Sequence, residues 1–292
     1  MIDGWRQHRW GPAIASLIVY GLAIATAWVT VTSQPASSLL WNALIADIAA
    51  TVVVFIASVV TRNSSIYDPY WSVAPPLLAA YWFWESGGDD LSPREWIVLI
   101  LITLWAARLT FNCMRRWTSY NEEDFRYQDL RARFGRWFPL VDLFGIELYP
   151  TVLVFLGCLP LMAVAGSNAP LGYLDGIAAS ITLGAILLEM IADEQMWAYR
   201  KIRTPEHPIC TRGVWRWSQH PNYLGEILFW WSIWVFGLAS GASASWMIAG
   251  ALAMTLLFVF ISIPMMLARK RARYENYDEL TKGIPVLLPH PF

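Results

Sequence analysis

Charged residues are scarce in this chain of 292 residues, where Asp, Glu, Lys and Arg together make up 15%. About 25% is ordinary for a soluble domain. Apolar residues make up 57%, against a usual share of roughly 45–50%. A soluble fold of this length could not bury so much apolar surface, so the composition excludes an ordinary soluble domain. It predicts a protein that is solvated largely by the lipid bilayer.

Histidine and cysteine are also few. Four scattered histidines exclude the histidine clusters of membrane di-iron enzymes, and we expect no metal site. Cys113, Cys158 and Cys210 follow no ligand spacing and are interpreted as reduced packing residues. The chain has neither familiar phosphate-binding glycine loop, and no Ser/His/Asp set is readable from its spacing. Its basic loops are explained by membrane topology, so nucleic acid is not an expected partner.

Long apolar runs are what the sequence has instead. A helix needs about 20 apolar residues to cross roughly 30 Å of hydrocarbon. The first run, 13–31, is too long for a signal-peptide core and no cleavage site follows it, so we interpret it as a retained span. We predict an all-α polytopic transmembrane bundle of about eight spans, at 13–32, 40–61, 67–84, 95–113, 146–166, 173–196, 223–240 and 244–267.

The placement of the basic residues supports an even number of spans. With the N-terminus inside, the inner segments are 1–12, 62–66, 114–145, 197–222 and 268–292. These segments hold 19 of the 21 Lys and Arg residues; Arg94 lies outside and Arg108 lies within a span. This asymmetry is typical of cytoplasmic loops. It predicts an integral membrane protein with both termini in the cytoplasm.

Charged side chains inside spans cost at least about 2.5–3.5 kcal/mol each, which makes them functional candidates. In the sixth span, Glu189, Asp193 and Arg200 fall close to one helical face. The like-charged pair Glu189/Asp193 is unfavourable alone. It requires a cation, a shared proton or hydrogen-bond donors from a ligand; a polar clamp with Arg108 is the structural alternative. The full set is Asp47, Asp68, Arg108, Glu147, Glu189, Asp193, Glu194 and Glu226.

The segment 212–226 is the densest motif in the chain. His220, Asn222, Tyr223 and Glu226 surround the predicted start of a helix, with Pro221 suited to its first turn. A helix N-terminus favours anionic ligand groups. We interpret the tryptophans of this segment, Trp215 and Trp217, as interfacial anchors of the aromatic belt.

A third motif, at 67–72, opens the third predicted span. Asp68, with the phenols of Tyr67 and Tyr70 beside it, could polarise a carbonyl group or donate a proton in a dry pocket. Asp68 before proline also fits a helix cap, and the two roles are compatible.

Together these stretches resemble a known family. From about 64 to 289 the chain is similar to the steroid 5-alpha-reductase-like membrane reductases, especially their bacterial branch. The likeness lies at 68–72, 108–112, 192–201 and 213–226, in a basic C-terminal segment with Arg273-Tyr274, and in the closing 284–289. The resemblance implies a seven-helix reductase-like core, to which the N-terminal span 13–32 is added. The domain division that we expect is 1–63 for the N-terminal transmembrane helices and 64–292 for the reductase domain. The resemblance also favours a bacterial inner membrane.

The resemblance implies NADPH as the cofactor, in a helical bundle open to the cytoplasm. Asp193 and Asn222 would contact the nicotinamide end, and Arg200, Lys201 and Arg212 the phosphates, which guanidinium groups suit. The remaining members of the implied cofactor set are Arg108, Glu189, His220, Tyr223, Glu226, Arg269, Lys270, Arg273 and Tyr274.

Members of this family reduce a carbon–carbon double bond conjugated to a ketone. An acidic group polarises the ketone oxygen while hydride adds to the β-carbon. In the steroid reductases that group is a glutamate in a Gln-Glu-x-Pro-Ser motif, helped by a tyrosine. The nearest match here is Asp68, with Tyr67 and Tyr70. The implied substrate is a lipophilic enone, steroid- or isoprenoid-like.

Two other function classes remain open. The spacing of Gly213, His220-Pro221, Tyr223 and Gly225 also resembles isoprenylcysteine-type and phospholipid methyltransferases, which bind S-adenosylmethionine. Those enzymes usually carry a glutamate pair where this chain has Leu267-Ala268 followed by three basic residues, and a polyphosphate suits the basic residues better. A transporter that moves protons or ions past Glu189 and Asp193 is the non-enzymatic alternative; the lack of internal symmetry argues against it.

Overall fold

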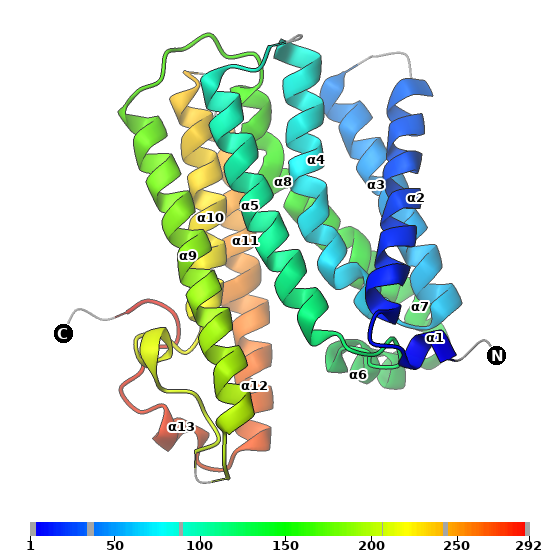
Figure 1. The fold of residues 1–292 in the computed structure, drawn as a ribbon, viewed down its shortest axis with the longest axis vertical. Coiled ribbons are helices and arrows are strands. Elements are labelled where there is room, and N and C mark those ends of the chain that lie inside the picture. The colour runs from blue at the N-terminus through cyan, green and yellow to red at the C-terminus, as the bar shows by residue number, and fades with distance from the viewer. Residues whose placement is uncertain (1–3, 34–37, 88–89, 206, 242–244, 290–292) are drawn as a thin grey trace. The chain divides into compact units, whose positions relative to one another are not determined.

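The computed structural model describes residues 4–33, 38–87, 90–205, 207–241 and 245–289. Within these ranges the chain is 81% helical and has no strand, so the predicted all-α helical bundle is confirmed (Figure 1). The N-terminal helices are α1 (Gly4–Gln7), α2 (Gly11–Ser33), α3 (Leu39–Thr61), α4 (Tyr67–Gly87), α5 (Pro93–Arg116), α6 (Phe125–Phe134), α7 (Phe138–Val141) and α8 (Tyr149–Val164). The C-terminal helices are α9 (Tyr173–Ile202), α10 (Pro221–Ala239), α11 (Ile248–Leu257), α12 (Ile263–Arg273) and α13 (Tyr277–Leu280).

Six helical segments of the described chain are long and apolar enough to cross a membrane. They are Gly11–Ser33, Leu39–Thr61, Pro93–Arg116, Phe125–Val164, Tyr173–Ile202 and Ile248–Arg273. The other two predicted spans, 67–84 and 223–240, are the helices α4 and α10, but neither is among the six. Both carry polar residues in the first two turns, which lowers their mean hydropathy.

Two stretches depart from the ordinary α-helix. Asp142–Leu148 and Phe258–Ser262 are π-helical and continue directly into α8 and α12. π-Helical turns are rare and are frequent at functional sites.

The chain forms two compact units. Unit 1 comprises 1–91 and 102–158, and unit 2 comprises 92–101 and 159–292. The predicted boundary at residue 63 follows the family resemblance and stays a prediction.

In unit 1, α2 packs against α3, and the core below them is rich in tyrosine. The Tyr20 hydroxyl donates a hydrogen bond of 2.6 Å to the carbonyl of Ile66, and the ring of Tyr20 lies 5.5 Å from that of Tyr70. A phenol buried among helices needs such a partner for its hydroxyl. The bond fixes the entry of the chain into α4.

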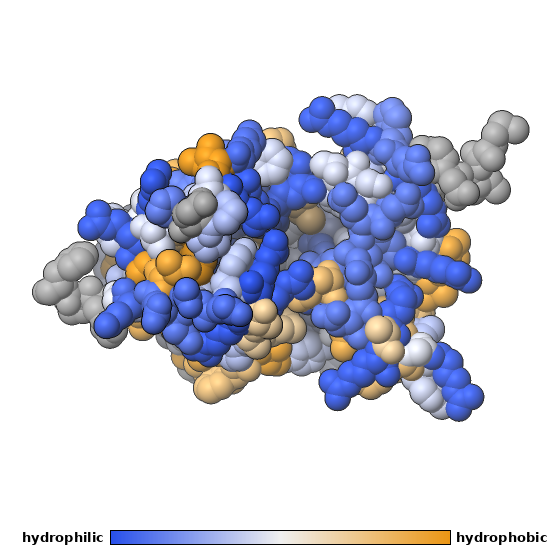
Figure 2. All heavy atoms as spheres, turned by 90° about the horizontal axis from the view of Figure 1, so that it is seen from below, coloured by the Kyte–Doolittle hydropathy of each residue, from blue (hydrophilic) through white to orange (hydrophobic). Residues whose placement is uncertain are grey.

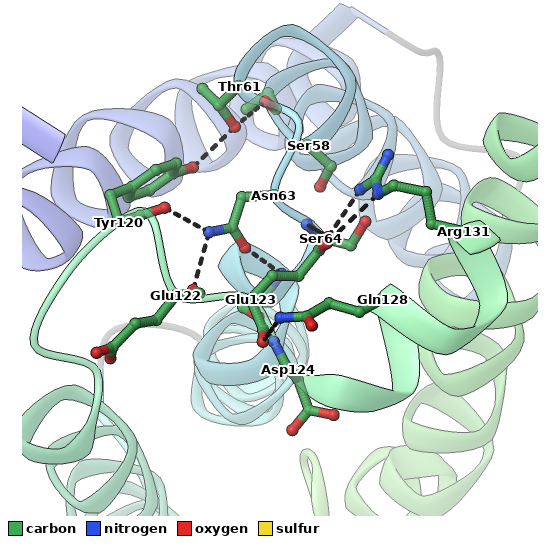
Figure 3. Close-up of polar contacts among 12 residues, drawn as sticks. Ser58, Thr61, Asn63, Ser64, Tyr120, Glu122, Glu123, Asp124, Gln128 and Arg131 are labelled. Atoms are coloured by element: carbon green, nitrogen blue, oxygen red, sulfur yellow. Dashed lines mark hydrogen bonds and ion pairs between the residues drawn. The ribbon is translucent and has the colours of Figure 1, made fainter. Parts of the chain in front are cut away.

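The polar end of unit 1 joins three segments that are far apart in the sequence. Figure 3 shows two of them, with Asn63 beside Tyr120 and Glu122. Asn63 caps a short 3₁₀ turn, and its amide donates to the carbonyls of Tyr120 and Glu122 at 2.7 and 3.0 Å. The backbone amide of Tyr120 donates to the carbonyl of Arg6. The predicted inner segments 1–12, 62–66 and 114–145 therefore meet, as a shared side of the membrane requires.

In unit 2, α9 packs along α10 (Figure 1). At the end where α9 begins, Arg94 is buried and bonds both oxygens of Asp175, at 2.7 and 2.9 Å, and the carbonyls of Ala169 and Pro170. The one basic residue that was predicted outside is thus fully paired. At the opposite end of α9, the inner segments 197–222 and 268–292 meet through Gln219, which donates from its backbone amide to the carbonyl of Pro285.

Candidate functional site

In the motif at 213–226, Gly225 is required by the close packing of two helices in unit 2. A Cβ atom on Gly225 would lie 2.4 Å from Cγ of Glu189 and 3.0 Å from the carbonyl oxygen of Ala185. Only glycine lets the first turns of α10 approach α9 here. The approach buries Glu189 against α10, and Glu226 is buried one residue further on.

Gly213 has a different role. Its φ of +57° is left-handed, and an added Cβ would lie 2.2 Å from Oε1 of Gln195. That oxygen accepts a hydrogen bond from the amide of Val214 at 2.9 Å. Gln195 on α9 therefore holds the turn that presents Arg212.

The two tryptophans of the motif behave differently. Trp215 is buried beside Cys210 and Ala192, and its indole donates to the carbonyl of Ala192 at 3.0 Å. The interpretation of Trp215 as an interfacial anchor is wrong, because its ring packs the loop onto α9. Trp217 is 50% exposed, which agrees with an interfacial position.

His220 stands immediately before α10, with no side-chain cap bond at that helix start. Its ring is buried, stacks on Tyr223 at 5.2 Å, and leaves Nε2 without a hydrogen-bond partner in the described chain. Burial and the repulsion of nearby Lys270 lower the pKa of His220 to about 3. It is therefore neutral at physiological pH and offers one acceptor or donor to a ligand.

The C-terminal segment is tied to the same loop. Tyr277 donates from its hydroxyl to Oε1 of Gln219 at 2.8 Å, and the Gln219 amide group donates to the carbonyl of Ile284 at 2.8 Å. Lys270 lies over the Tyr277 ring at 5.7 Å. These contacts bring the basic end of α12 to the start of α10.

Basic side chains gather at this end of unit 2, which Figure 2 shows to be covered largely by hydrophilic residues. Arg200, Lys201, Arg212 and Arg273 are exposed, while Asp193, Asn222, Tyr223, Arg269, Lys270 and Tyr274 are half-buried. The elements that carry them are the last turns of α9, the 212–220 loop, the first turn of α10 and the last turns of α12. Uncapped amides and cations together favour an anion.

The predicted catalytic residues lie in unit 1, at the start of α4. Oδ1 of Asp68 accepts a 2.5 Å hydrogen bond from the Tyr127 hydroxyl and lies 3.5 Å from the Arg126 guanidinium. The Asp68 carboxyl group is thus held by one hydrogen-bond donor and one nearby cation. A carboxyl group can serve as a general acid in catalysis.

Tyr67 and Tyr70 are buried, with ring centroids 5.8 Å apart. The Tyr67 hydroxyl and that of Thr151 are 2.8 Å apart, and Thr151 is in turn 3.1 Å from the Thr51 hydroxyl. Tyr67 therefore belongs to a run of hydroxyls rather than standing alone.

The structure groups the predicted residues by unit. Asp68, Tyr67, Tyr70 and Arg108 belong to unit 1, and all the other members of the predicted cofactor set belong to unit 2. Sequence reasoning missed Gln195, Gln219, Tyr277 and Thr151 as supporting residues. Their partners lie 19 to 84 residues away along the chain, and no spacing rule connects them.

A family comparison accounts for most of the chain. The model of a family described as a protein of unknown function, DUF1295, matches residues 54–283. The chain belongs to this family. The family is known as steroid 5-alpha-reductase-like, which agrees with the resemblance at the level of the family.

A curated relative is an uncharacterized protein of Schizosaccharomyces pombe, 32% identical over 216 residues. The match covers 65% of this chain and 62% of the relative, so the chain spans less than two thirds of that protein. No solved structure is significantly similar to the chain.

Proposed function

We propose that this DUF1295 member is an NADPH-dependent membrane reductase that transfers hydride to the conjugated C=C bond of a lipophilic enone, steroid- or isoprenoid-like. The observation that carries the proposal is the basic end of unit 2. There the 212–220 loop and the C-terminal segment are hydrogen-bonded together around the uncapped start of α10. The family membership supports the same assignment.

The chemistry of this end fits a phosphorylated dinucleotide. Arg200, Lys201 and Arg212 extend exposed cationic groups that suit phosphate oxygens. The neutral, buried His220 and the half-buried Asn222 provide uncharged polar groups for a nicotinamide carboxamide. NADPH, when bound, would supply the hydride.

Asp68 is the proposed acid. Its carboxyl group accepts a hydrogen bond from Tyr127 and lies 3.5 Å from the Arg126 guanidinium, and a carboxyl group can hold or release a proton. The buried phenol of Tyr67 would donate a hydrogen bond to the ketone oxygen and stabilise the negative charge that develops there. We place this chemistry at the cytoplasmic side, with both termini inside, in a bacterial inner membrane.

A thermal unfolding assay of the purified protein in detergent tests the proposal. NADPH at a hundredfold excess over its dissociation constant adds about 2.7 kcal/mol of stability. For a chain of this size, each kcal/mol raises the unfolding temperature by roughly 2–4 °C. Arg200→Ala should remove most of the shift. The matched control, Arg133→Ala on the exposed surface of α6, should keep it.

Other ligands discriminate the alternatives in the same assay. A shift with S-adenosylmethionine and none with NADPH would assign the protein to the methyltransferases. A shift with neither would reject both enzymatic assignments and favour transport.

A further inference from the structure

Three carboxyl groups lie buried inside unit 1 and have no assigned role in the proposed reaction. Asp47 on α3 is 6% exposed, and Asp142 and Glu147 in the π-helical turn are 1% and 0% exposed. Each has one oxygen without a hydrogen-bond partner in the described chain. Such groups cost several kcal/mol in the bilayer unless they are paired or neutral.

The π-helix places two of these acids on one face. In an ordinary α-helix, residues five apart differ by about 0.4 of a turn. In the wider turn of a π-helix, with its i→i+5 hydrogen bonds, they lie closer to one face, and Asp142 and Glu147 are five apart. This geometry explains why both side chains point inward from a single turn.

The surroundings of Glu147 suit a protonated, uncharged carboxyl group. Its Oε1 accepts a hydrogen bond of 2.6 Å from the Ser58 hydroxyl, and Oε2 has no partner. In the described residues, no Lys or Arg forms an ion pair with Glu147 or with Asp47. Asp142 interacts electrostatically with Arg131 and Glu123, at the polar end of the unit, and with Glu147. Figure 3 shows Arg131 and Glu123 there, with Ser58 and Ser64 nearby.

A line of polar groups therefore runs inward from that end. It starts at Glu123 and Arg131, continues through Asp142 to Glu147, and reaches the neighbourhood of Tyr67, with which Glu147 and Asp47 both interact electrostatically. The hydroxyls of Tyr67, Thr151 and Thr51 continue it.

We infer that Glu147 is a buried, protonated acid that returns a proton to Tyr67 after Tyr67 has donated its own. Glu147 is then reprotonated from the polar end of unit 1 through Asp142. The role in catalysis rests on the proposed reductase. In that reaction the hydride that adds to the β-carbon comes from NADPH, and the proton that adds to the other carbon of the double bond comes from the protein. When Tyr67 gives up its hydroxyl proton, Glu147 loses one to restore the phenol and becomes a carboxylate. A proton from the cytoplasm then restores the acid, so that one proton enters per turnover.

Infrared spectroscopy of the resting protein tests this without substrate or cofactor. A protonated carboxyl group has a C=O stretching band that is separate from the carboxylate bands. We expect this band at neutral pH, a downshift in D₂O because the proton exchanges, and loss of intensity in Glu147→Gln. The matched control, Asp129→Asn on the exposed face of α6, should leave the band unchanged.

Ser58→Ala provides a second variant that retains the acid. Loss of the 2.6 Å hydrogen bond should move the band to higher frequency. A wild-type protein without the band, a band whose intensity is unchanged in Glu147→Gln, or a band that does not shift in D₂O would overturn the proposal. Failure of NADPH to bind would remove the reductase assignment and leave the infrared result intact, so the two failures are distinguishable.

Discussion

Replacing Gly225 by alanine tests the packing that builds the site in unit 2. In a helix interior, alanine is ordinarily more stable than glycine by roughly 0.5–1 kcal/mol. At Gly225 the new Cβ would lie 2.4 Å from Glu189 Cγ and 3.0 Å from the Ala185 carbonyl oxygen. Extra methyl groups in a filled interior typically cost about 1–3 kcal/mol. We expect a net loss of about 1–2 kcal/mol.

Gly184 on α9 is the matched control. An added Cβ there meets nothing within 4 Å, so Gly184→Ala should be neutral or stabilising. The two alanine variants should differ by about 2 kcal/mol, or by roughly 4–8 °C in unfolding temperature in detergent. Glu189→Ala removes the Cγ atom, so the double variant with Gly225→Ala should recover about 1 kcal/mol relative to additivity. If Gly225→Ala is as stable as Gly184→Ala, the close approach of α9 and α10 does not exist.

Three further predictions concern stability. Arg94→Ala leaves Asp175 buried without its partner, so unfolding free energy should fall by about 3–5 kcal/mol; an unchanged denaturant midpoint would contradict the buried pair. Gly213→Ala forces a left-handed φ on alanine and a clash with Gln195, so it should lower the unfolding temperature, and Gln195→Ala in the same chain should relieve part of the loss. His220 has a folded pKa of about 3 and an ordinary value of 6.5, so only the unfolded chain takes up a proton between these values and stability falls as the pH is lowered. Between pH 6.5 and 5 the wild type should lose about 1.6 kcal/mol more than His220→Asn; parallel pH profiles would refute the buried, neutral His220.

The long helices could be predicted from the sequence because crossing the bilayer requires about 20 apolar residues in a row, and six of the eight expected spans correspond to segments that meet this requirement. Even α4 and α10, which contain more polar residues, begin and end within four residues of the expected bounds. The basic residues also predicted which loops lie at the same end of each unit. The hydrogen bonds between Asn63 and Tyr120, and between Gln219 and Pro285, join segments that were predicted to share a side.

The packing partners could not be predicted, since all-apolar helices have weak periodicity. Glu147 was recognisable as a buried charge, but its partner Ser58 is 89 residues away. Gly225 was visible in a motif, whereas its contact with Glu189 depends on how α10 packs on α9. The π-helical turn at 142–148 has no sequence signal of its own, because a widened turn is stabilised by tertiary contacts.

Direct binding of NADPH is the most decisive measurement. Nicotinamide fluorescence, titrated with the purified protein in lipid nanodiscs, should show saturable binding of NADPH. Arg200→Ala should weaken it about tenfold or more, since a charge-assisted hydrogen bond contributes roughly 1.5–3 kcal/mol. Absence of saturable binding, or equal binding by the wild type and Arg200→Ala, would contradict a dinucleotide site at the basic end of unit 2.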